Sequence, residues 1–525
     1  RKPGLYRRFC LAFDTAFEKM SEKYKNGIRP FIKRPWTAFV VVIASVLVMI
    51  WSVKTTPAGF VPQEDKGMFL CDVIMPPSTS LSITTETMEK VVEEIKVLDG
   101  VKNVGMVAGY GFTAGRASNA GFIIITLKDW EEREFMSIYK TMQEIYFNIS
   151  THYPDASLMP FMMPMIPGYG SSADTELYLQ DKVGGEITDF DKMKSEFLAA
   201  LNENPKINSA YTAFSVDNPQ WLVSVDVARC KKSGIDLSTL MSTLSAYIGG
   251  AYVNDVNLYG KTYKVMVQGT PDSHVDETCL NQTYARTKEG TLAPLSNFIS
   301  LKRIYGPSSL ARFNLLNSIQ INASPASGVS TGDLINAING TAAEVLPKDF
   351  SIEYGGMARE QSQGSSMMLI FGLSALLIFL ILSSLYESYV VPFSIMLSVP
   401  LGIMGAFLMT RLFGLDNNIY LQTGVVMLIG LLSKTGILIV EFALQKRHEG
   451  LSIKDAALEA AKARLRPIFM TAGTMVIGLL PLLTSTGVGA MGNISLGVGA
   501  IFGMLVGCIG LLFLVPSLFV IFQAI

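Results

Sequence analysis

The chain has 525 residues, of which 49% are hydrophobic and 17% are charged. This composition excludes an intrinsically disordered chain, because there is ample apolar surface to bury. Lysine plus arginine total 43 against 44 acidic residues, and a net charge of −1 gives no bulk electrostatic reason to expect a nucleic-acid partner. Five scattered cysteines without CxxC or other metal-type spacing favour buried thiols over a disulfide framework. They are Cys10, Cys71, Cys230, Cys279 and Cys508.

Six runs of the sequence are long and apolar enough to cross a membrane. A bilayer core of about 30 Å needs roughly 20 apolar helical residues. The expected spans are Trp36–Val53, Met367–Tyr386, Val390–Thr410, Ile419–Leu444, Pro467–Leu483 and Leu496–Phe522. Because the chain begins at Arg1 and ends on an apolar Ile525, we expect a piece of a longer polypeptide.

Basic residues in the connecting segments predict the orientation. Residues 1–34 carry ten Lys/Arg against three acids, and residues 446–466, expected to be a loop, carry six Lys/Arg. Both segments fall on one side if the spans alternate, so the positive-inside rule places them in the cytoplasm. The polar block between the first two spans then lies outside, in the periplasm of a diderm host. Within residues 1–34, the pattern from Tyr6 to Lys25 predicts an amphipathic helix on the inner leaflet, with a simple charged tail as the alternative.

The polar block contains the same element order twice. In the first copy, strand and helix patterns follow each other as β-α-β-β-α-β, the order of the ferredoxin-like or split-βαβ fold. Its elements are expected at residues 68–75, 80–98, 101–108, 121–128, 134–151 and 156–162. The second copy is expected at residues 175–180, 188–202, 207–214, 318–323, 330–345 and 351–354.

An insertion at residues 216–312 divides the second copy. It has its own strands at 220–226 and 264–268, a helix at 236–247 and a Gly-rich arm at 249–260. The sequence therefore predicts an α+β membrane protein. It has six transmembrane helices and a periplasmic block of two ferredoxin-like (βαββαβ) subdomains, with an inserted α+β subdomain.

Long, position-ordered runs resemble those of resistance-nodulation-division (RND) multidrug efflux pumps. The segment from Gly430 to Phe442 is similar to the lysine-bearing span of that family. Further similar runs are Arg464–Thr471, Leu385–Ser388, Pro392–Ser394, Leu127–Trp130 and Tyr252–Asp255, together with Gly67. The resemblance covers essentially the whole chain, but it corresponds only to the C-terminal half of such a pump.

The resemblance implies a proton-driven exporter of the bacterial inner membrane, and no cofactor. It implies a homotrimer that works with the N-terminal half of the same pump, a periplasmic adaptor protein and an outer-membrane channel. Residues 57–165 would form the first porter subdomain, residues 166–215 with 313–362 the second, and residues 216–312 the docking subdomain. Residues 1–34 would be the cytoplasmic amphipathic segment, 35–56 the first transmembrane helix and 363–525 the other five. The arm at 249–260 would reach into the neighbouring subunit.

Lys434 places a positive charge in the middle of a predicted span. An ammonium at bilayer depth costs roughly 2.5–3.5 kcal/mol, so it needs a carboxylate or a water-filled cavity. Glu441 shares its helix face but lies two turns away, too far for a direct pair. The resemblance implies that aspartates of the other half pair with Lys434, that protonation releases it, and that Arg464 and Thr471 complete the proton relay. Arg464 also suits a positive-inside anchor, and Thr471 a hydroxyl bonded to a backbone carbonyl.

Two segments are candidates for contact with substrate. The first alternates glycine with aromatic residues from Gly109 to Gly115, through Tyr110, Gly111 and Phe112. The resemblance implies that this segment is a mobile switch loop whose rings line a drug pocket. The alternative is a hairpin turn whose aromatic residues cover the core.

The second candidate segment is rich in methionine. Met159 and Phe161 stand where the family has pocket phenylalanines, whereas Gly105 and Ile124 replace aromatic residues that are common there. A flexible Met/aromatic wall accommodates small apolar or amphiphilic substrates of many shapes.

Other functions remain open at this point. Thioethers select Cu(I) or Ag(I), so the methionines also suit a soft-metal exporter of the same family. Only three histidines occur, and none stands at a ligand spacing, so no metal site is assigned. They are His152, His274 and His448. A secretion or assembly factor of the same fold is a third possibility. No phosphate-binding loop or hydrolase motif is present, so we expect a secondary transporter and no enzyme.

Overall fold

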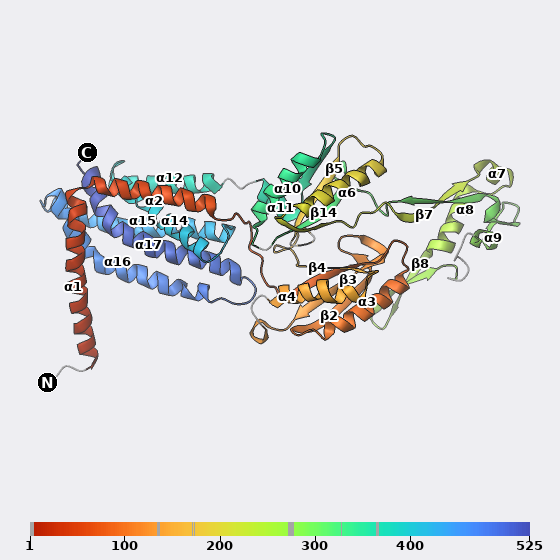
Figure 1. Cartoon of the computed structure of the whole chain (residues 1–525), viewed down its shortest axis with the longest axis horizontal. Helices are drawn as coiled ribbons and strands as arrows, with labels where there is room; N and C mark the ends of the chain where they lie inside the picture. The colour runs from red at the N-terminus through yellow and green to blue at the C-terminus, as the bar shows by residue number, and fades with distance from the viewer. Residues whose placement is uncertain are drawn as a thin grey trace. The chain divides into compact units, whose positions relative to one another are not determined.

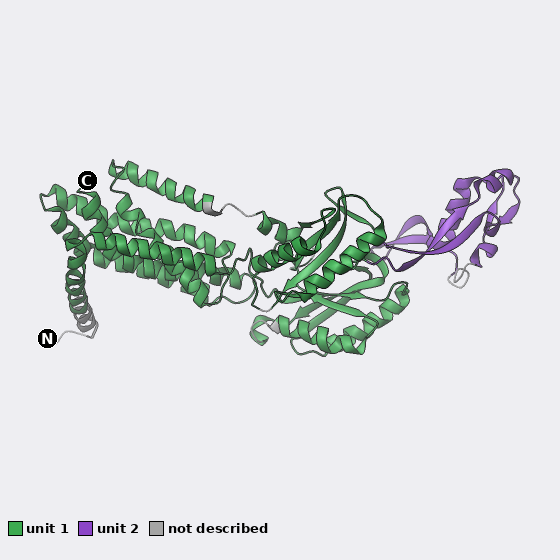
Figure 2. Cartoon of the chain, turned by 45° about the horizontal axis from the view of Figure 1, so that its top comes forward, with its two compact units in different colours: residues 1–214, 310–525 green, residues 215–309 purple. Residues whose placement is uncertain are grey.

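The computed structural model describes residues 5–133, 137–170, 172, 174–270, 278–326, 328–363 and 367–524. The chain divides into two compact units, residues 1–214 with 310–525 and residues 215–309 (Figure 2). The first unit contains a bundle of long helices and two modules built from strands and helices. The second unit is an α+β module with its own core.

Six helical segments among the described residues are long and apolar enough to cross a membrane, in the places that the sequence predicts. They are α2 (Trp36–Thr55), α12 (Met367–Tyr386), α13 with α14 (Phe393–Met396 and Val399–Leu412), α15 (Ile419–His448), α16 (Ile453–Leu483) and α17 (Ala490–Phe522) (Figure 1). The third segment is divided at Leu397–Ser398, and Pro400 lies in the first turn of α14. A proline is tolerated there because the first turn needs no N–H donor.

Helix α17 packs against α14, α15 and α16 and is the most buried of these segments. Small residues allow the close approach of α14. A Cβ added to Gly503 would lie 3.1 Å from the carbonyl oxygen of Gly402, and one added to Gly507 would lie 3.1 Å from the Gly402 Cα. Backbones in such contact gain packing that larger side chains would prevent.

The segment Lys446–Arg466, expected to be a loop, is almost entirely helical. Helix α15 continues to His448 and α16 begins at Ile453. The Ser452 hydroxyl accepts a 3.2 Å hydrogen bond from the Asp455 N–H and caps α16. The expectation was wrong because charged side chains mark where a helix leaves the bilayer, not where it ends.

Helix α1 (Leu5–Lys33) confirms the helix predicted near the N-terminus. Its apolar face is partly covered by protein instead of lipid, since Ile28 and Ile32 are buried in the core formed with α15, α16 and α17. The Tyr24 hydroxyl donates a 2.6 Å hydrogen bond to the Leu512 carbonyl. Lys462 of α16 pairs with Glu22 at 2.6 Å.

The first α/β module shows the predicted order of strands and helices. Its elements are β1 (Met68–Ile74), α3 (Leu81–Lys96), β2 (Val101–Gly111), β3 (Gly115–Leu127), a helical stretch of α4 (Ser137–Glu144), a π segment (Ile145–Ile149) and α5 (Ser150–His152), and β4 (Ser157–Phe161). The antiparallel sheet has the order β2-β3-β1-β4. Helix-side residues such as Cys71, Ile123 and Met88 form its core. The predicted helix start at residues 134–136 lies outside the described residues.

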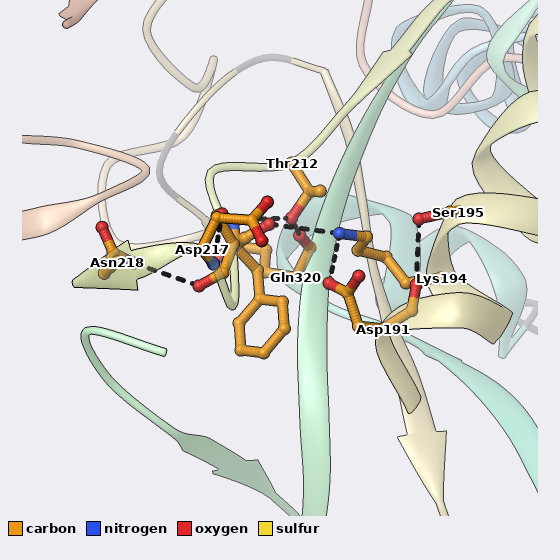
Figure 3. Close-up of polar contacts among 9 residues, drawn as sticks. Asp191, Lys194, Ser195, Thr212, Asp217, Asn218 and Gln320 are labelled. Atoms are coloured by element: carbon orange, nitrogen blue, oxygen red, sulfur yellow. Dashed lines mark hydrogen bonds and ion pairs between the residues drawn. The ribbon is translucent and has the colours of Figure 1, made fainter. Parts of the chain in front are cut away.

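The second α/β module has the corresponding order and includes one additional strand, β13. Its elements are β5 (Thr175–Asp181), α6 (Ile187–Glu203), β6 (Ile207–Tyr211), β13 (Ala311–Phe313), β14 (Leu316–Pro325), α10 (Thr331–Val345) and β15 (Phe350–Tyr354). Figure 3 shows how α6 holds the segment after β6. Lys194 pairs with Asp191 at 2.6 Å and donates to the Phe214 carbonyl at 3.4 Å, while the Thr212 hydroxyl donates to the Gln320 carbonyl.

The second unit is built around Leu240 and Leu295, which are fully buried. It contains β7 (Asn218–Val225), α7 (Val227–Lys232), α8 (Leu237–Leu244), β8 (Ala251–Leu258), β9 (Lys261–Val267), α9 (Cys279–Gln282), β10 (Tyr284–Arg286), β11 (Leu292–Pro294) and β12 (Ile299–Gly306). The Gly-rich arm is a two-stranded hairpin, because β8 pairs with β9 in antiparallel register.

Candidate functional site

Lys434 lies on a face of α15 that is exposed in the described structure. Thr423, Met427, Gly430 and Glu441 are exposed on the same stripe, whereas Leu428 and Leu432, on the opposite side, are fully buried. Among the described residues, no carboxylate forms an ion pair with Lys434. An unpaired ammonium in a membrane-spanning helix is costly unless a carboxylate or water reaches it.

Arg464 and Thr471 have different environments on α16. The Arg464 guanidinium stacks on the Phe442 ring of α15, with its carbon 4.7 Å from the ring centroid. Its Nε is buried, and none of the residues that the structure describes forms a hydrogen bond with it. The Thr471 hydroxyl donates to the carbonyls of Pro467 and Ile468, both at 3.0 Å. In the described part of the chain, no hydrogen bond joins either residue to Lys434.

Four aromatic rings gather where the β2–β3 hairpin folds over the sheet. The Phe112 ring packs edge-on against Phe122 at 4.9 Å and against Phe161 at 5.9 Å, measured between ring centroids. Tyr110 lies 6.2 Å from Phe112 and from Phe122. Such edge-to-face pairs are favourable. These four residues are called the aromatic cluster below.

The aromatic cluster brings together three predicted residues and one that sequence analysis missed. Phe122 was not singled out, because it stands in an apolar strand run. Met159 lies on β4, opposite Asp72 in the strand register. Tyr110 is 43% exposed, whereas Phe161 is 3% exposed. The Tyr110 ring is therefore accessible to solvent, and the Phe161 ring is the buried base of the cluster.

The segment Gly109–Gly115 is a tight hairpin connection and not a long loop. Strand β2 continues to Gly111 and β3 begins at Gly115, where Gly111 and Gly115 pair. Gly109 has φ +85° and Gly115 has φ +69°, values that side chains with a Cβ rarely adopt. Both glycines therefore shape the turn that carries Phe112.

Asp72 was also missed. It is the single charged residue of β1 and is fully buried. Its carboxylate accepts hydrogen bonds from the backbone N–H groups of Phe112 and Thr113, at 2.9 and 3.0 Å. A lone acid in an apolar strand is a signal that sequence analysis had available, although its partners were not predictable.

A second acid, Asp174, is partly buried and directly precedes β5 of the second module. Burial raises the pKa of Asp174 to about 6, while a hydrogen bond from the Tyr211 hydroxyl, at 3.4 Å, acts in the opposite direction. The carboxylates of Asp174 and Asp72 both raise the pKa of Tyr211, after burial as the main cause.

The methionines of the second candidate segment make separate contacts. Met162 is buried in the helix-side core of the first module, and the Met165 sulfur accepts a 3.3 Å hydrogen bond from the Glu64 N–H. In the described residues, no group of three or more His, Cys, Asp or Glu side chains is placed to hold a metal ion.

The six apolar helices and the large α/β region define a multi-pass membrane protein, and that region fits a periplasmic domain. Residues 1–523 match the model of the AcrB/AcrD/AcrF family. The chain therefore belongs to this family of RND multidrug efflux transporters.

Two relatives illustrate the similarity. The toluene efflux pump membrane transporter TtgB of Pseudomonas putida is 33% identical over 513 residues, which cover 97% of this chain and 48% of that protein. The multidrug resistance protein MdtF of Escherichia coli is 33% identical over 522 residues, covering 97% of this chain and 50% of the relative. The chain thus spans about half the length of these curated relatives.

Proposed function

We propose that this chain supplies the C-terminal half of an RND pump that exports hydrophobic and amphiphilic compounds in exchange for protons. The observation that carries the proposal is the uncovered Lys434 in the middle of α15. The names of the relatives, which are efflux pump and multidrug resistance proteins, support export as the activity.

In this proposal, helices of the N-terminal half cover the exposed stripe of α15. Acidic side chains of those helices neutralise Lys434, because a charge at bilayer depth requires a counter-charge. Protonation of the acids removes the pair and frees the ammonium, which lets the helices repack. The proton gradient then drives the cycle.

Arg464 and Thr471 contribute to this relay on α16. Arg464 is held in place by the Phe442 ring, and its buried Nε has no hydrogen-bond partner within the described part of the chain. Thr471 exchanges one of its backbone hydrogen bonds for a contact with the incoming acids. Both steps accompany the release of Lys434.

The aromatic cluster supplies substrate contact. Tyr110 and Phe112 present ring faces and edges to apolar or cationic groups. Met159 extends the same surface, and Phe161 forms its buried base. Gly109, Gly111 and Gly115 give the hairpin turn the freedom to act as the switch loop. Ile124 and Gly105 stand where aromatic residues are common in the family, so this pocket contains fewer aromatic rings.

The two α/β modules are the porter subdomains, each ferredoxin-like, at residues 57–165 and at 166–215 with 313–362. The sheet order β2-β3-β1-β4 of the first module supports this assignment. Residues 216–312 form the docking subdomain, which the separate compact unit at 215–309 supports. Residues 1–34, 35–56 and 363–525 form the membrane-associated and membrane-spanning parts.

The β8–β9 hairpin inserts into a neighbouring copy in a homotrimer. Every residue from Tyr252 to Val267 is exposed, including Tyr252, Val256 and Met266, and an apolar hairpin of this kind gains stability when a partner covers it. The trimer works with a periplasmic adaptor protein and an outer-membrane channel.

The test is ethidium efflux in cells that lack their own pumps and express the complete native gene product. Lys434→Ala should abolish efflux at unchanged protein level. Lys454→Ala, which removes an exposed lysine at the start of α16, should retain it. Normal efflux by Lys434→Ala would overturn the proton-coupled mechanism.

Substrate contact is tested separately in the same cells. Phe112→Ala should lower efflux of ethidium and toluene, whereas Phe147→Ala, which removes an exposed ring of the same module, should not. Equal effects of the two variants would remove the aromatic cluster from the substrate path.

A further inference from the structure

Asp72 lies on the sheet face that the helices of the first module do not cover. Its register partners are Phe122 on β3 and Met159 on β4, so the three side chains share that face. Neighbouring positions Cys71 and Val73 point to the helix-side core. The carboxylate is therefore buried beneath the aromatic cluster.

The carboxylate of Asp72 is satisfied by the turn above it. Oδ1 accepts the Phe112 N–H at 2.9 Å, and Oδ2 accepts the Thr113 N–H at 3.0 Å and the Thr113 hydroxyl at 2.6 Å. Within the described residues, no lysine, arginine or histidine forms an ion pair with it. A buried carboxylate without a counter-cation is stable only while such donors are in place.

These contacts determine where Phe112 lies. The Phe112 N–H is bonded to Asp72, and the ring of the same residue reaches Phe122 and Phe161. If the turn lifted, Asp72 would lose all three hydrogen bonds at once and the ring would leave its neighbours. The position of the ring and the satisfaction of the acid are therefore coupled.

We propose that Asp72 is a positioning residue that latches the turn Gly111–Gly115 over the sheet and thereby sets the substrate-contacting position of Phe112. The proposal rests on the proposed function of the aromatic cluster. The latch itself is a property of the turn and is measurable without transport.

The experiment is hydrogen–deuterium exchange on the purified complete gene product without substrate. Asp72→Ala should speed amide exchange in a peptide covering residues 111–115 at least tenfold. Asp72→Asn keeps one acceptor oxygen and should increase the exchange rate by an intermediate factor. Thr113→Val removes only the hydroxyl and should have the smallest effect. The peptide covering β4 should keep its wild-type rate in all three.

The matched control is Ser118→Ala, which removes the 3.0 Å hydrogen bond from the Ser118 hydroxyl to the Thr79 carbonyl, a contact near the start of β3 that does not involve Asp72. It should leave exchange at residues 111–115 unchanged. Two results would overturn the latch. One is a wild-type exchange rate of the turn in Asp72→Ala, and the other is an increase of the exchange rate in β4 as large as the increase in the turn. Asp72→Asn and Thr113→Val carry the test if Asp72→Ala does not fold.

A double-mutant cycle tests the link to Phe112. Ethidium affinity, measured by fluorescence polarisation, should fall in Asp72→Ala and in Phe112→Ala, and the double variant should bind no more weakly than Phe112→Ala. Additive losses would contradict action through Phe112. If Asp72→Ala speeds exchange of the turn but the wild-type protein binds no ethidium, the proposed substrate site is refuted. The positioning role of Asp72 is then retained.

Discussion

The Glu64 carboxylate accepts a 3.1 Å hydrogen bond from the backbone N–H of Gly492, although 428 positions separate the two residues. It also accepts the Gly489 N–H at the start of α17. Glu64 is 8% exposed and lies between the first span and β1. An acid at a helix N-terminus satisfies unpaired donors and complements the helix dipole. The segment that enters the first module is thereby tied to the most buried membrane helix.

Replacing Glu64 by Gln should lower the stability of the purified protein by about 1–2 kcal/mol, because a charged acceptor becomes neutral. The measurement is the apparent Tm in detergent. Glu449→Gln changes a half-exposed carboxylate at the end of α15 and should shift stability by at most about 0.5 kcal/mol. Equal Tm values for the two variants would show that the contact to α17 contributes nothing.

The neighbouring Asp65 forms a two-pronged ion pair with Arg133, and both side chains are almost completely buried. Breaking such a pair leaves a buried charge without its partner and costs about 3–5 kcal/mol. Arg133→Ala should therefore lower the apparent Tm strongly, whereas Arg116→Ala, at an exposed position of β3, should have little effect. A mild Arg133→Ala phenotype would contradict this estimate.

Asp174 should make stability depend on pH. Its folded-state pKa is raised to about 6 by burial, against about 3.9 in an unfolded chain. The folded state thus binds more protons between these values, so stability falls as pH rises from about 4 to about 6. Asp174→Asn should remove this loss and stabilise the protein at pH 7.5 by up to about 3 kcal/mol. Solvent screening of the carboxyl lowers this gain.

The measurement is the apparent Tm at pH 4.5 and at pH 7.5. Asp155→Asn, at an exposed turn, is the control and should keep the wild-type pH profile. If Asp174→Asn also keeps that profile, the acid does not titrate in this window.

Phe442 should matter through Arg464. The stacking contact at 4.7 Å contributes about 0.5–2 kcal/mol. Phe442→Leu keeps the apolar volume but removes the ring face, so efflux by the complete gene product should fall, while Phe442→Trp should retain it. Phe469→Leu, which alters an exposed ring on α16, is the control. Full efflux by Phe442→Leu would show that the ring does not position Arg464.

The membrane segments and the strand order were predictable because they depend on local patterns. Uncharged runs and alternating apolar residues identified the six spans and both α/β modules. The ends of α16 and α15 were not predictable from charge, since the helices continue beyond the apolar runs. The π segment Ile145–Ile149 was not predictable either, because its pattern of apolar residues does not differ from that of an α-helix.

The candidate site was only partly predictable. Tyr110, Phe112 and Phe161 were named as candidates, and the strands bring their rings together on one face. Their contact with substrate stays a prediction. Asp72 and Glu64 were missed because their partners lie 40 and more than 400 positions away. Contacts of this kind depend on strand pairing and helix packing, which residue patterns alone do not specify.

We propose that Lys434 couples proton movement to export. Proton flux tests this step in proteoliposomes that contain the complete native gene product, with a pH-sensitive dye inside and ethidium as substrate. We expect ethidium-dependent proton flux in the wild type and in Glu441→Gln, and none in Lys434→Ala. Undiminished ethidium-dependent proton flux in Lys434→Ala would contradict it.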